Sequence, residues 1–517
     1  MMQTEVFHPS WTLYKDMNPS PDDQVGSYGE FSYVAGCDFS APFTMPNDFY
    51  KIPSISDFAS LFSNEFLQFP ASDEELQATL PVEDFDMGLE GFDSVLSDKV
   101  FEDTDVWSPS QSTKSSEGSM DTALTLPGES MEIDNQLGVL HLLKAYGEAM
   151  EREQSELAEV IMRCLSEKVS PGGETLERIA FNLSPDVEKQ GDYLLQESSK
   201  NYETAFRTFY QRFPYGRFAH FAANSAIMEA MPDDAKIVHI VDFDLGEGVQ
   251  WPSMIEAIAR KNKMLRLTAM KREEEDEDFA CASVSSTFEE TKRQLGDYAR
   301  SFGLKLEVEE MGIEDLVKEI KKTKKRGGEA GDGQWLVFNC MVGLPHMGRV
   351  RSRKLVKEFL HVAKELLSSK GGNVTKNRAI VTLGDGDACE KLTDCSGFGS
   401  FFDGQLEHYK ALLESMKNNF PVHLEEARMA METLFVKPCV SSQVWFQKWE
   451  ETRQGYHLQA GGVGLKESKF SREILMEARE IVNEESLFGV TIGGQSENEM
   501  VLEWGGTPLV RVSSWKN

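Results

Sequence analysis

A short β-branched run in the middle of the chain, followed by two glycines and a helix-like segment, constrains the fold more than any other feature. Residues 237–243 read IVHIVDF, a composition that is typical of a buried parallel strand. Gly246 and Gly248 allow a tight turn after it, and residues 249–261 resemble a helix. Strand, glycine turn and helix make up the first βα unit of a doubly wound sheet. We therefore expect an α/β fold here.

Strand-like and helix-like segments alternate from this unit to the end of the chain. The alternation predicts a Rossmann-like, mostly parallel sheet with right-handed crossovers. Tight turns near the end predict a C-terminal β-hairpin that adds antiparallel edge strands. The further expected strands are residues 265–270, 305–311, 335–344, 378–386, 488–494, 499–506 and 508–515. We expect one α/β core over residues 233–517.

The segment before this core, residues 136–232, has the hydrophobic period of α-helices and predicts a helical cap. We expect one side of its first part to be buried, namely Leu140, Leu143, Tyr146, Met150, Leu157, Val160, Ile161 and Cys164. Leu140, Leu142 and Leu143 form a short leucine cluster that fits two interpretations. It can dock a helical partner, or it can be the buried side of the first helix, which we favour.

The charge is concentrated in residues 1–135, which carry 26 acidic side chains and four lysines, or −22 of the net charge of −33. They also carry 12 of the 32 phenylalanines, and such a mixture cannot easily bury a core. We expect a disordered segment, with aromatic residues at helical spacing in 55–69 and 82–101. Two interpretations fit equally well. The segment can be an acidic activation-type region that folds onto a partner, or it can be a solvated tail. The acidic balance argues against unaided DNA binding.

The glycine turn is a degraded match to a nucleotide site. A third glycine is missing, and Glu247 would face a phosphate, which disfavours a dinucleotide. Lys271 and Arg272 stand where an acidic residue would hold ribose hydroxyls. S-adenosylmethionine carries no phosphate, so a methyltransferase remains an alternative, with a cofactor held by Asp242, Asp244, Gly246 and Gly248.

Other chemistry finds little support. No nucleophile elbow, zinc-protease helix or P-loop occurs, and the seven cysteines have no zinc-ligand spacing. Residues 385–387, Asp-Gly-Asp, fit a metal loop or, more commonly, a glycine-rich acidic loop. His239, inside a strand, is expected to be a core residue. We assign no catalytic, cofactor or metal site. With neither a secretory signal nor a membrane span, we expect a protein of a reducing compartment.

Two basic clusters stand out in the core. The first is a candidate nuclear-import signal or an exposed helix end, and the sequence leaves both open. The second we expect to be an exposed helix end or loop. The first consists of Lys321, Lys322, Lys324, Lys325 and Arg326, and the second of Arg349, Arg351, Arg353 and Lys354.

Residues 238–252, VHIVDFDLGEGVQWP, resemble the VHIID signature of the plant GRAS family of transcriptional regulators. Residues 141–150 and 218–231 resemble the two ends of that family's first leucine-rich region, and residues 265–270 the strand that opens its second. The closing segment 499–515 is similar to the SAW region, although it reads Ser-Ser-Trp at its end. The resemblance covers about residues 137–517, and the run VFNCMVGLPHM favours the branch that acts in nodulation signalling.

The resemblance implies a methyltransferase-like α/β core with a helical cap, in a nuclear protein that is not an enzyme and needs no cofactor. Family members regulate transcription, often as homo- or heterodimers formed through the cap. We expect another GRAS protein as the partner, transcription machinery bound by the acidic N-terminus, promoter DNA contacted indirectly through the partner, and no membrane association. The VHIID-like motif is expected to be structural, and it consists of Val238, His239, Ile240, Val241 and Asp242.

Overall fold

The computed structural model describes residues 130–516, with gaps at 186–187, 272–286, 326–332, 369–378, 390–391, 393–394, 457–463 and 483–486. Most of the predicted acidic segment, including both amphipathic stretches, lies outside the described residues. No described helix combines the length and apolar character that crossing a membrane requires.

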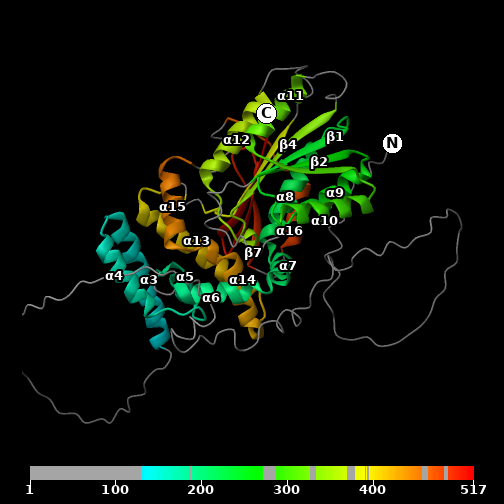
Figure 1. The fold of residues 1–517 in the computed structure, drawn as a ribbon. Helices are drawn as coiled ribbons and strands as arrows, with labels where there is room; N and C mark the ends of the chain where they lie inside the picture. Colours follow the sequence, from blue (N-terminus) through cyan, green and yellow to red (C-terminus); the bar gives the residue numbers. More distant parts are fainter. Residues whose placement is uncertain are drawn as a thin grey trace, which may run out of the picture. The chain divides into compact units, whose positions relative to one another are not determined.

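One mixed sheet forms the centre of the described chain, with the strand order β3-β2-β1-β4-β5-β9-β8-β7 and a short β6 beside β9 (Figure 1). β1 to β5 are parallel, and β1 pairs with both β2 and β4. Such an order is that of a doubly wound fold, in which the order reverses between β1 and β4. The predicted fold class is therefore confirmed. The parallel strands are β1 (Ile237–Asp242), β2 (Met264–Met270), β3 (Leu306–Met311), β4 (Gln334–Val342) and β5 (Ile380–Asp385).

The C-terminal strands differ from the expected edge hairpin, because they form a three-stranded antiparallel extension of the sheet. β9 (Thr507–Lys516) lies between β5 and β8 (Glu499–Trp504), antiparallel to both, and β7 (Phe488–Gly493) is the outer strand. β6 (Lys466–Glu467) also pairs with β9. β9 is thus an internal strand, which explains why Val510, Val512 and Trp515 are buried.

Helices cover both faces of the sheet. α8 (Pro214–Ala230), α9 (Trp251–Arg260) and α10 (Phe288–Ser301) lie on one side, and α11 (Ile313–Lys325) and α12 (Arg353–Ser368) on the other (Figure 1). A core of β1, β4 and β5 residues packs under α11 and α12, with Phe338 and Phe359 fully buried. The sheet therefore has two covered faces, as the nearly continuous apolar runs of its parallel strands require.

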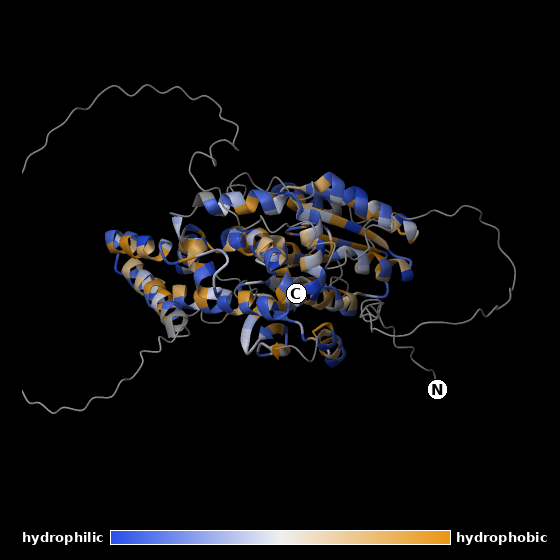
Figure 2. Ribbon diagram, turned by 90° about the horizontal axis from the view of Figure 1, so that it is seen from below, coloured by the Kyte–Doolittle hydropathy of each residue, from blue (hydrophilic) through white to orange (hydrophobic). Residues whose placement is uncertain are grey.

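We call the five helices before α8 the cap. Their helical pattern mixes apolar and polar residues along each helix (Figure 2). α8 was expected to belong with them, but it packs directly on β5 and β9, and 12 of its residues are buried. The cap helices are α3 (Ser130–Glu151), α4 (Ser155–Ser166), α5 (Thr175–Leu183), α6 (Glu188–Ser199) and α7 (Tyr202–Arg212).

Four described helices follow the parallel strands in the second half of the chain, and two of them pack against the cap. α13 (Phe398–Asn418) packs against α5, and α14 (Glu425–Phe435) against α6 and α7. α15 (Ser442–Arg453) packs against α12 and α13, while α16 (Arg472–Ile481) packs against α8 and β7. Short 3₁₀ turns connect α13 to α14 at Val422–Leu424 and α14 to α15 at Lys437–Cys439, and a further one, Pro345–Met347, lies between β4 and α12.

A buried ion pair joins the cap to α14. The Arg178 guanidinium of α5 lies 3.0 Å from the Glu432 carboxylate, and Arg428 contacts the same carboxylate. Tyr215 of α8 also contacts α13, since its hydroxyl lies 2.6 Å from that of Ser415. Cap and core are therefore held by polar contacts as well as by apolar packing.

Candidate functional site

The VHIID-like motif lies in β1, and its side chains are buried within the described fold. Val238, Ile240 and Val241 are fully buried. His239 is buried as well, with Nε2 2.9 Å from the Thr268 hydroxyl and Nδ1 2.7 Å from Gln334 Nε2. Burial lowers the pKa of His239 to about 3, so its imidazole is neutral at physiological pH. The expectation of a core histidine fits this geometry.

Asp242 ends β1 and ties three elements together. Its Oδ1 accepts a hydrogen bond from Asn339 of β4, and its Oδ2 accepts one from the Trp251 indole of α9, each at 3.0 Å. Burial raises the pKa of Asp242 to about 7, although both hydrogen bonds favour the ionised form. Gln250 and Thr382 complete the network by hydrogen-bonding to the Asn339 side chain. The Asp242 side chain thereby links the C-terminal ends of β1 and β4 to the start of α9.

The glycine turn that follows is closed by an ion pair. Asp244 accepts hydrogen bonds from Arg349, including one from Nε at 2.9 Å, and both side chains are buried. Arg351 lies 3.8 Å from the same carboxylate and 4.8 Å from the centre of the Phe243 ring. Gly246 and Gly248 both have positive φ, 53° and 70°. Glycine adopts this conformation readily, which explains why both positions of the turn are glycines.

The second basic cluster was expected to be exposed, and this expectation is wrong for three of its four members. Arg349, Arg351 and Arg353 are buried, and only Lys354 is exposed. The physical reason is charge pairing: Asp244 and Asp387 supply the carboxylates that make burial of the guanidinium groups tolerable. Arginine suits such pairs because its planar group binds a carboxylate through two donors.

Little space remains above the turn. The hollow there measures about 20 Å³ and is lined by residues that include Tyr202, His346 and Arg349. A volume of this size holds about one water molecule, far less than a nucleoside cofactor occupies. The four residues of the methyltransferase alternative are brought together at this turn, but Asp244 is occupied by Arg349.

Two buried histidines lie where α7 and α8 meet the 3₁₀ turn Pro345–Met347. The rings of His220 and His346 stand perpendicular with centres 5.0 Å apart, and the Tyr210 hydroxyl lies 2.8 Å from His220 Nδ1. Burial lowers the pKa of His220 to about 3. The pKa of His346 lies well below its ordinary value, because the ring is buried and His220 lies beside it. Both therefore pack as neutral aromatic rings.

The Asp-Gly-Asp loop after β5 holds cations of the chain itself. Asp387 lies 2.7 Å from the Lys448 ammonium of α15 and 3.2 Å from the Arg353 guanidinium of α12. Burial opposes its ionisation, but these two charges outweigh it and hold the pKa of Asp387 below its usual range. Among the described residues, no group of three or more His, Cys, Asp or Glu side chains is placed to hold a metal ion.

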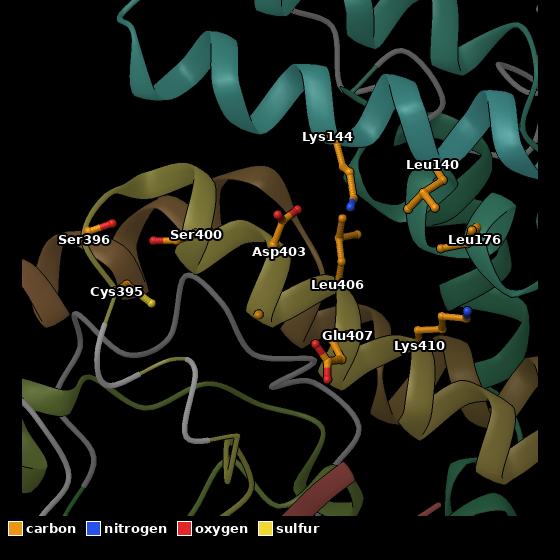
Figure 3. Close-up of a pocket in the computed structure, with 11 residues that line it drawn as sticks. Leu140, Lys144, Leu176, Cys395, Ser396, Ser400, Asp403, Leu406, Glu407 and Lys410 are labelled. Carbon is orange, nitrogen blue, oxygen red and sulfur yellow. The ribbon is translucent and has the colours of Figure 1, made fainter. Parts of the chain in front are cut away.

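The leucine cluster of α3 is divided between the core and a groove. Leu143 is fully buried, whereas Leu140 and Leu142 are half-buried. Leu140 and Lys144 point from α3 toward Leu406 and Asp403 of α13 (Figure 3). We call the space between these helices the cap groove. It measures about 770 Å³ and is lined by Leu140, Lys144, Leu176, Cys395, Ser396, Ser400, Asp403, Gly404, Leu406, Glu407 and Lys410.

A second apolar surface lies on the cap, and we call it the α4 surface. Leu157 and Val160, which the periodicity predicted to be buried, are 48% and 50% exposed, and Cys164 is also exposed. For these three residues the prediction is wrong. Ala158, Ile161, Met162 and Leu165 bury the other side of the helix. The apolar surface of α4 is therefore wider than the side that the described chain buries.

The candidate import signal lies at the end of α11. Lys321 and Lys322 are exposed, and Lys321 lies 2.8 Å from the Glu365 carboxylate of α12. Arg326 and the side chains of Lys324 and Lys325 lie outside the described residues. The cluster stays a prediction.

Fold and site together define a methyltransferase-like α/β domain with a closed ligand position and a helical cap. The chain belongs to the GRAS domain family, whose model matches residues 139–516. GRAS proteins are plant transcriptional regulators that interact with other GRAS proteins and with transcription factors.

Two curated relatives carry the same printed name, Protein NODULATION SIGNALING PATHWAY 2. The one from Medicago truncatula is 30% identical over 414 residues, which cover 73% of this chain and 76% of the relative. The one from Lotus japonicus is 31% identical over 325 residues, covering 58% and 60%. A solved structure, the crystal structure of SCL7 in Oryza sativa, is similar at 21% identity with a TM-score of 0.49, covering 73% of this chain and 99% of that one.

Proposed function

We propose that this protein is a nuclear transcriptional co-regulator that acts by pairing with another GRAS protein through its cap, and that it works in root symbiosis or a related signalling pathway. One observation carries the proposal. The position at which this fold would bind a cofactor is filled by the chain's own ion pair, while large apolar side chains are exposed on the cap. Protein binding, rather than catalysis, is the role that this distribution favours.

The α4 surface is the proposed pairing site. Leu157, Val160 and Cys164 stand three and four residues apart, so they share one side of α4. Leu137, at 50% exposure on α3, adds a further apolar side chain on the cap. Exposed apolar side chains at this spacing suit a helical partner that covers them with its own apolar side.

The pairing site is tested by a double substitution. Leu157→Ser with Val160→Ser should weaken pairing at least ten-fold and leave the folded chain as stable as the wild type, because both side chains are half-exposed. The matched control is Met476→Ser with Leu487→Ser, two residues that are 66% and 64% exposed elsewhere. Sedimentation velocity of the purified full chain, alone and mixed with other GRAS proteins, measures pairing. Equal pairing by both variants would refute the site.

The acidic N-terminal segment is proposed to recruit transcription machinery, while promoter DNA is reached through the partner. Removal of residues 1–129 leaves α3 intact, since this helix begins at Ser130. The truncated protein should pair like the full chain yet activate a reporter gene in plant cells only weakly. Full activation by the truncated protein would contradict the assigned role, and intact pairing shows that the truncation folds.

Nuclear entry is proposed to depend on the basic cluster that begins at Lys321. Alanine at both Lys321 and Lys322 should lower the nuclear fraction of a fluorescent fusion, because both side chains are exposed. Alanine at Lys354 and Lys357 is the comparison, since these lysines lie on α12. An unchanged nuclear fraction in the first variant would remove the cluster from the proposal.

A further inference from the structure

The two edges of the described sheet differ in how their backbones are protected. β3, at one end, contains three glutamates in the sequence LEVEEM, and one of them, Glu309, is paired with Arg266. Charged side chains on an edge strand are a common protection against pairing with another chain. β7, at the other end, reads FGVTIG and contains neither a charged residue nor a proline. The edge at β7 therefore lacks the protection that β3 has.

The backbone of β7 alternates between its partner β8 and an open side. The Leu487 carbonyl accepts a hydrogen bond from the Gly505 amide at 3.0 Å, so the Leu487 carbonyl points toward β8. In an antiparallel ladder, the backbone groups of successive residues point to opposite sides of the strand. No described strand pairs with the open side of β7. The residues of β7 whose amide and carbonyl groups face the open side are Phe488, Val490 and Ile492.

One side chain of α16 covers the middle of this open side. Arg479 Nε donates a hydrogen bond to the Val490 carbonyl oxygen at 3.3 Å, which agrees with the direction that the alternation gives to Val490. Arg479 is exposed, and no ion pair joins its guanidinium to a carboxylate that the structure describes. A positive charge at the edge therefore contacts a neutral acceptor only.

We propose that the open side of β7 is a docking site at which an extended, acidic segment of a partner protein adds to the sheet as a further strand. Such a strand takes its affinity from backbone hydrogen bonds and its specificity from alternate side chains. A carboxylate binds a guanidinium more strongly than a neutral carbonyl oxygen does. An acid on the incoming strand therefore draws Arg479 away from Val490, and this carbonyl then accepts a hydrogen bond from the strand's own amide.

The surroundings of the edge favour apolar residues beside the acid. Met476 and Arg479 lie three residues apart and share one side of α16, and Met476 is 66% exposed. On the face of β7 that carries Leu487, this leucine is 64% exposed, and a Cβ on Gly489 would meet nothing within 4 Å. A large apolar side chain of the incoming strand thus finds room over Gly489, between Leu487 and Thr491. The partner segment that fits this edge alternates apolar residues and contains an acid.

Charge argues against a second copy of this chain at the same edge. The β7 strand of a second copy brings no carboxylate to Arg479, because FGVTIG contains no acid. Antiparallel pairing of two β7 strands about Val490 would also place the two Arg479 side chains close together, and like charges in such positions are destabilising. Arg479 therefore disfavours the pairing of identical edges and favours an acidic strand.

The site is tested with phage-displayed peptides of about eight residues, selected on the purified full-length protein. The peptides that the wild type enriches should alternate apolar residues and contain an acid. Ile492→Pro removes one amide on the open side and keeps the hydrogen bonds to β8, because the Ile492 backbone points away from β8. It should weaken binding of the enriched peptide at least ten-fold relative to Ile492→Ala, the matched control that keeps this amide. Fluorescence anisotropy measures both affinities.

A second variant tests the charge and does not depend on a proline that the fold must tolerate. Arg479→Glu changes an exposed side chain, so the folded chain should be as stable as the wild type. It should weaken binding of the acidic peptide at least ten-fold and strengthen binding of the same peptide with lysine in place of the acid. Hydrogen exchange of the Phe488, Val490 and Ile492 amides should slow when the acidic peptide binds to the wild type.

Each other outcome overturns the proposal. Enrichment of no acidic peptide, or equal binding to Ile492→Pro and Ile492→Ala, would show that the edge of β7 takes no partner strand. A dimer of the wild type that Ile492→Pro dissociates in sedimentation velocity would assign the edge to a second copy. Slow exchange of the three amides without peptide, lost on removal of residues 1–129, would assign it to this chain's own first segment. None of these results depends on whether the α4 surface pairs.

Discussion

Two hollows in the described part of the chain differ in almost every respect. The one above the glycine turn, at the carboxyl ends of β1 and β4, measures about 20 Å³ and is lined by buried, paired charges. The cap groove measures about 770 Å³ and is lined by leucines with charges at its rim. The first is where a doubly wound sheet binds its ligand, and the second is specific to the helices added before and after it.

The difference lies in where each hollow finds partners for its charges. Asp244 is not missing from the turn; it is occupied by an arginine that comes from 105 residues further along the chain. Asp387, at the end of β5, is likewise held by Arg353 and Lys448. Charges at the ends of these strands are therefore paired within the chain, whereas the exposed apolar side chains of the α4 surface lie on the cap.

The largest effect is expected from opening the closed turn. Arg349→Ala leaves the buried Asp244 carboxylate without its main partner, which should cost about 3–5 kcal/mol of unfolding free energy. Urea denaturation followed by circular dichroism measures the loss. Lys305→Ala, which breaks an exposed pair with Glu307, is the control and should unfold like the wild type. A loss no larger than that of the control would mean that the ion pair does not hold the turn.

Asp242 should make the closed turn sensitive to pH. Its pKa is raised to about 7 in the folded state, so between pH 4 and 7 the folded protein binds a proton that the unfolded chain has released. Stability from this group is therefore complete at low pH and is lost as the pH rises toward 7, by up to about 4 kcal/mol. Asp242→Asn removes this titration. The stability difference between wild type and variant should shrink steadily from pH 4 to 7, whereas a constant difference would contradict the raised pKa.

A smaller effect is expected from the glycine that lets β4 and β5 end side by side. A Cβ on Gly386 would lie 1.8 Å from the Gly343 carbonyl oxygen, so Gly386→Ala should cost about 1–3 kcal/mol. Gly296→Ala is the opposite case, because this glycine lies within α10 and an added Cβ meets nothing within 4 Å. It should stabilise the protein by about 0.4–1 kcal/mol. Thermal unfolding of both variants tests the sign, and a tolerated Gly386→Ala would mean that the strand ends are loosely packed.

Much of the closed turn could be predicted from the sequence, because its signals are local. A β-branched run, two glycines and an amphipathic helix are read from about 25 consecutive residues, and they placed β1, the turn and α9 correctly. The missing third glycine also indicated a degraded site. What closes the site could not be predicted, since nothing in the spacing of Arg349 or Arg353 indicates a carboxylate that meets it only in the folded chain.

The cap shows the opposite pattern. Periodicity located α3 and α4, but it assigned Leu157 and Val160 to a buried stripe that the structure leaves exposed. The periodicity of apolar residues on a helix does not distinguish a contact within the same chain from a contact with a partner. The groove depends on α13, which lies about 260 residues away from α3, so only the fold reveals it. α14, α15 and α16 were not expected, although the apolar residues of α16 do follow one side of the helix.

The claim that the turn is closed to ligands is tested most directly by calorimetric titration of the purified full-length protein with S-adenosylmethionine. The Asp244–Arg349 ion pair and the 20 Å³ hollow predict no saturable heat at millimolar ligand. Saturable binding with a micromolar dissociation constant, about −8 kcal/mol, that is lost in Gly246→Trp would contradict it.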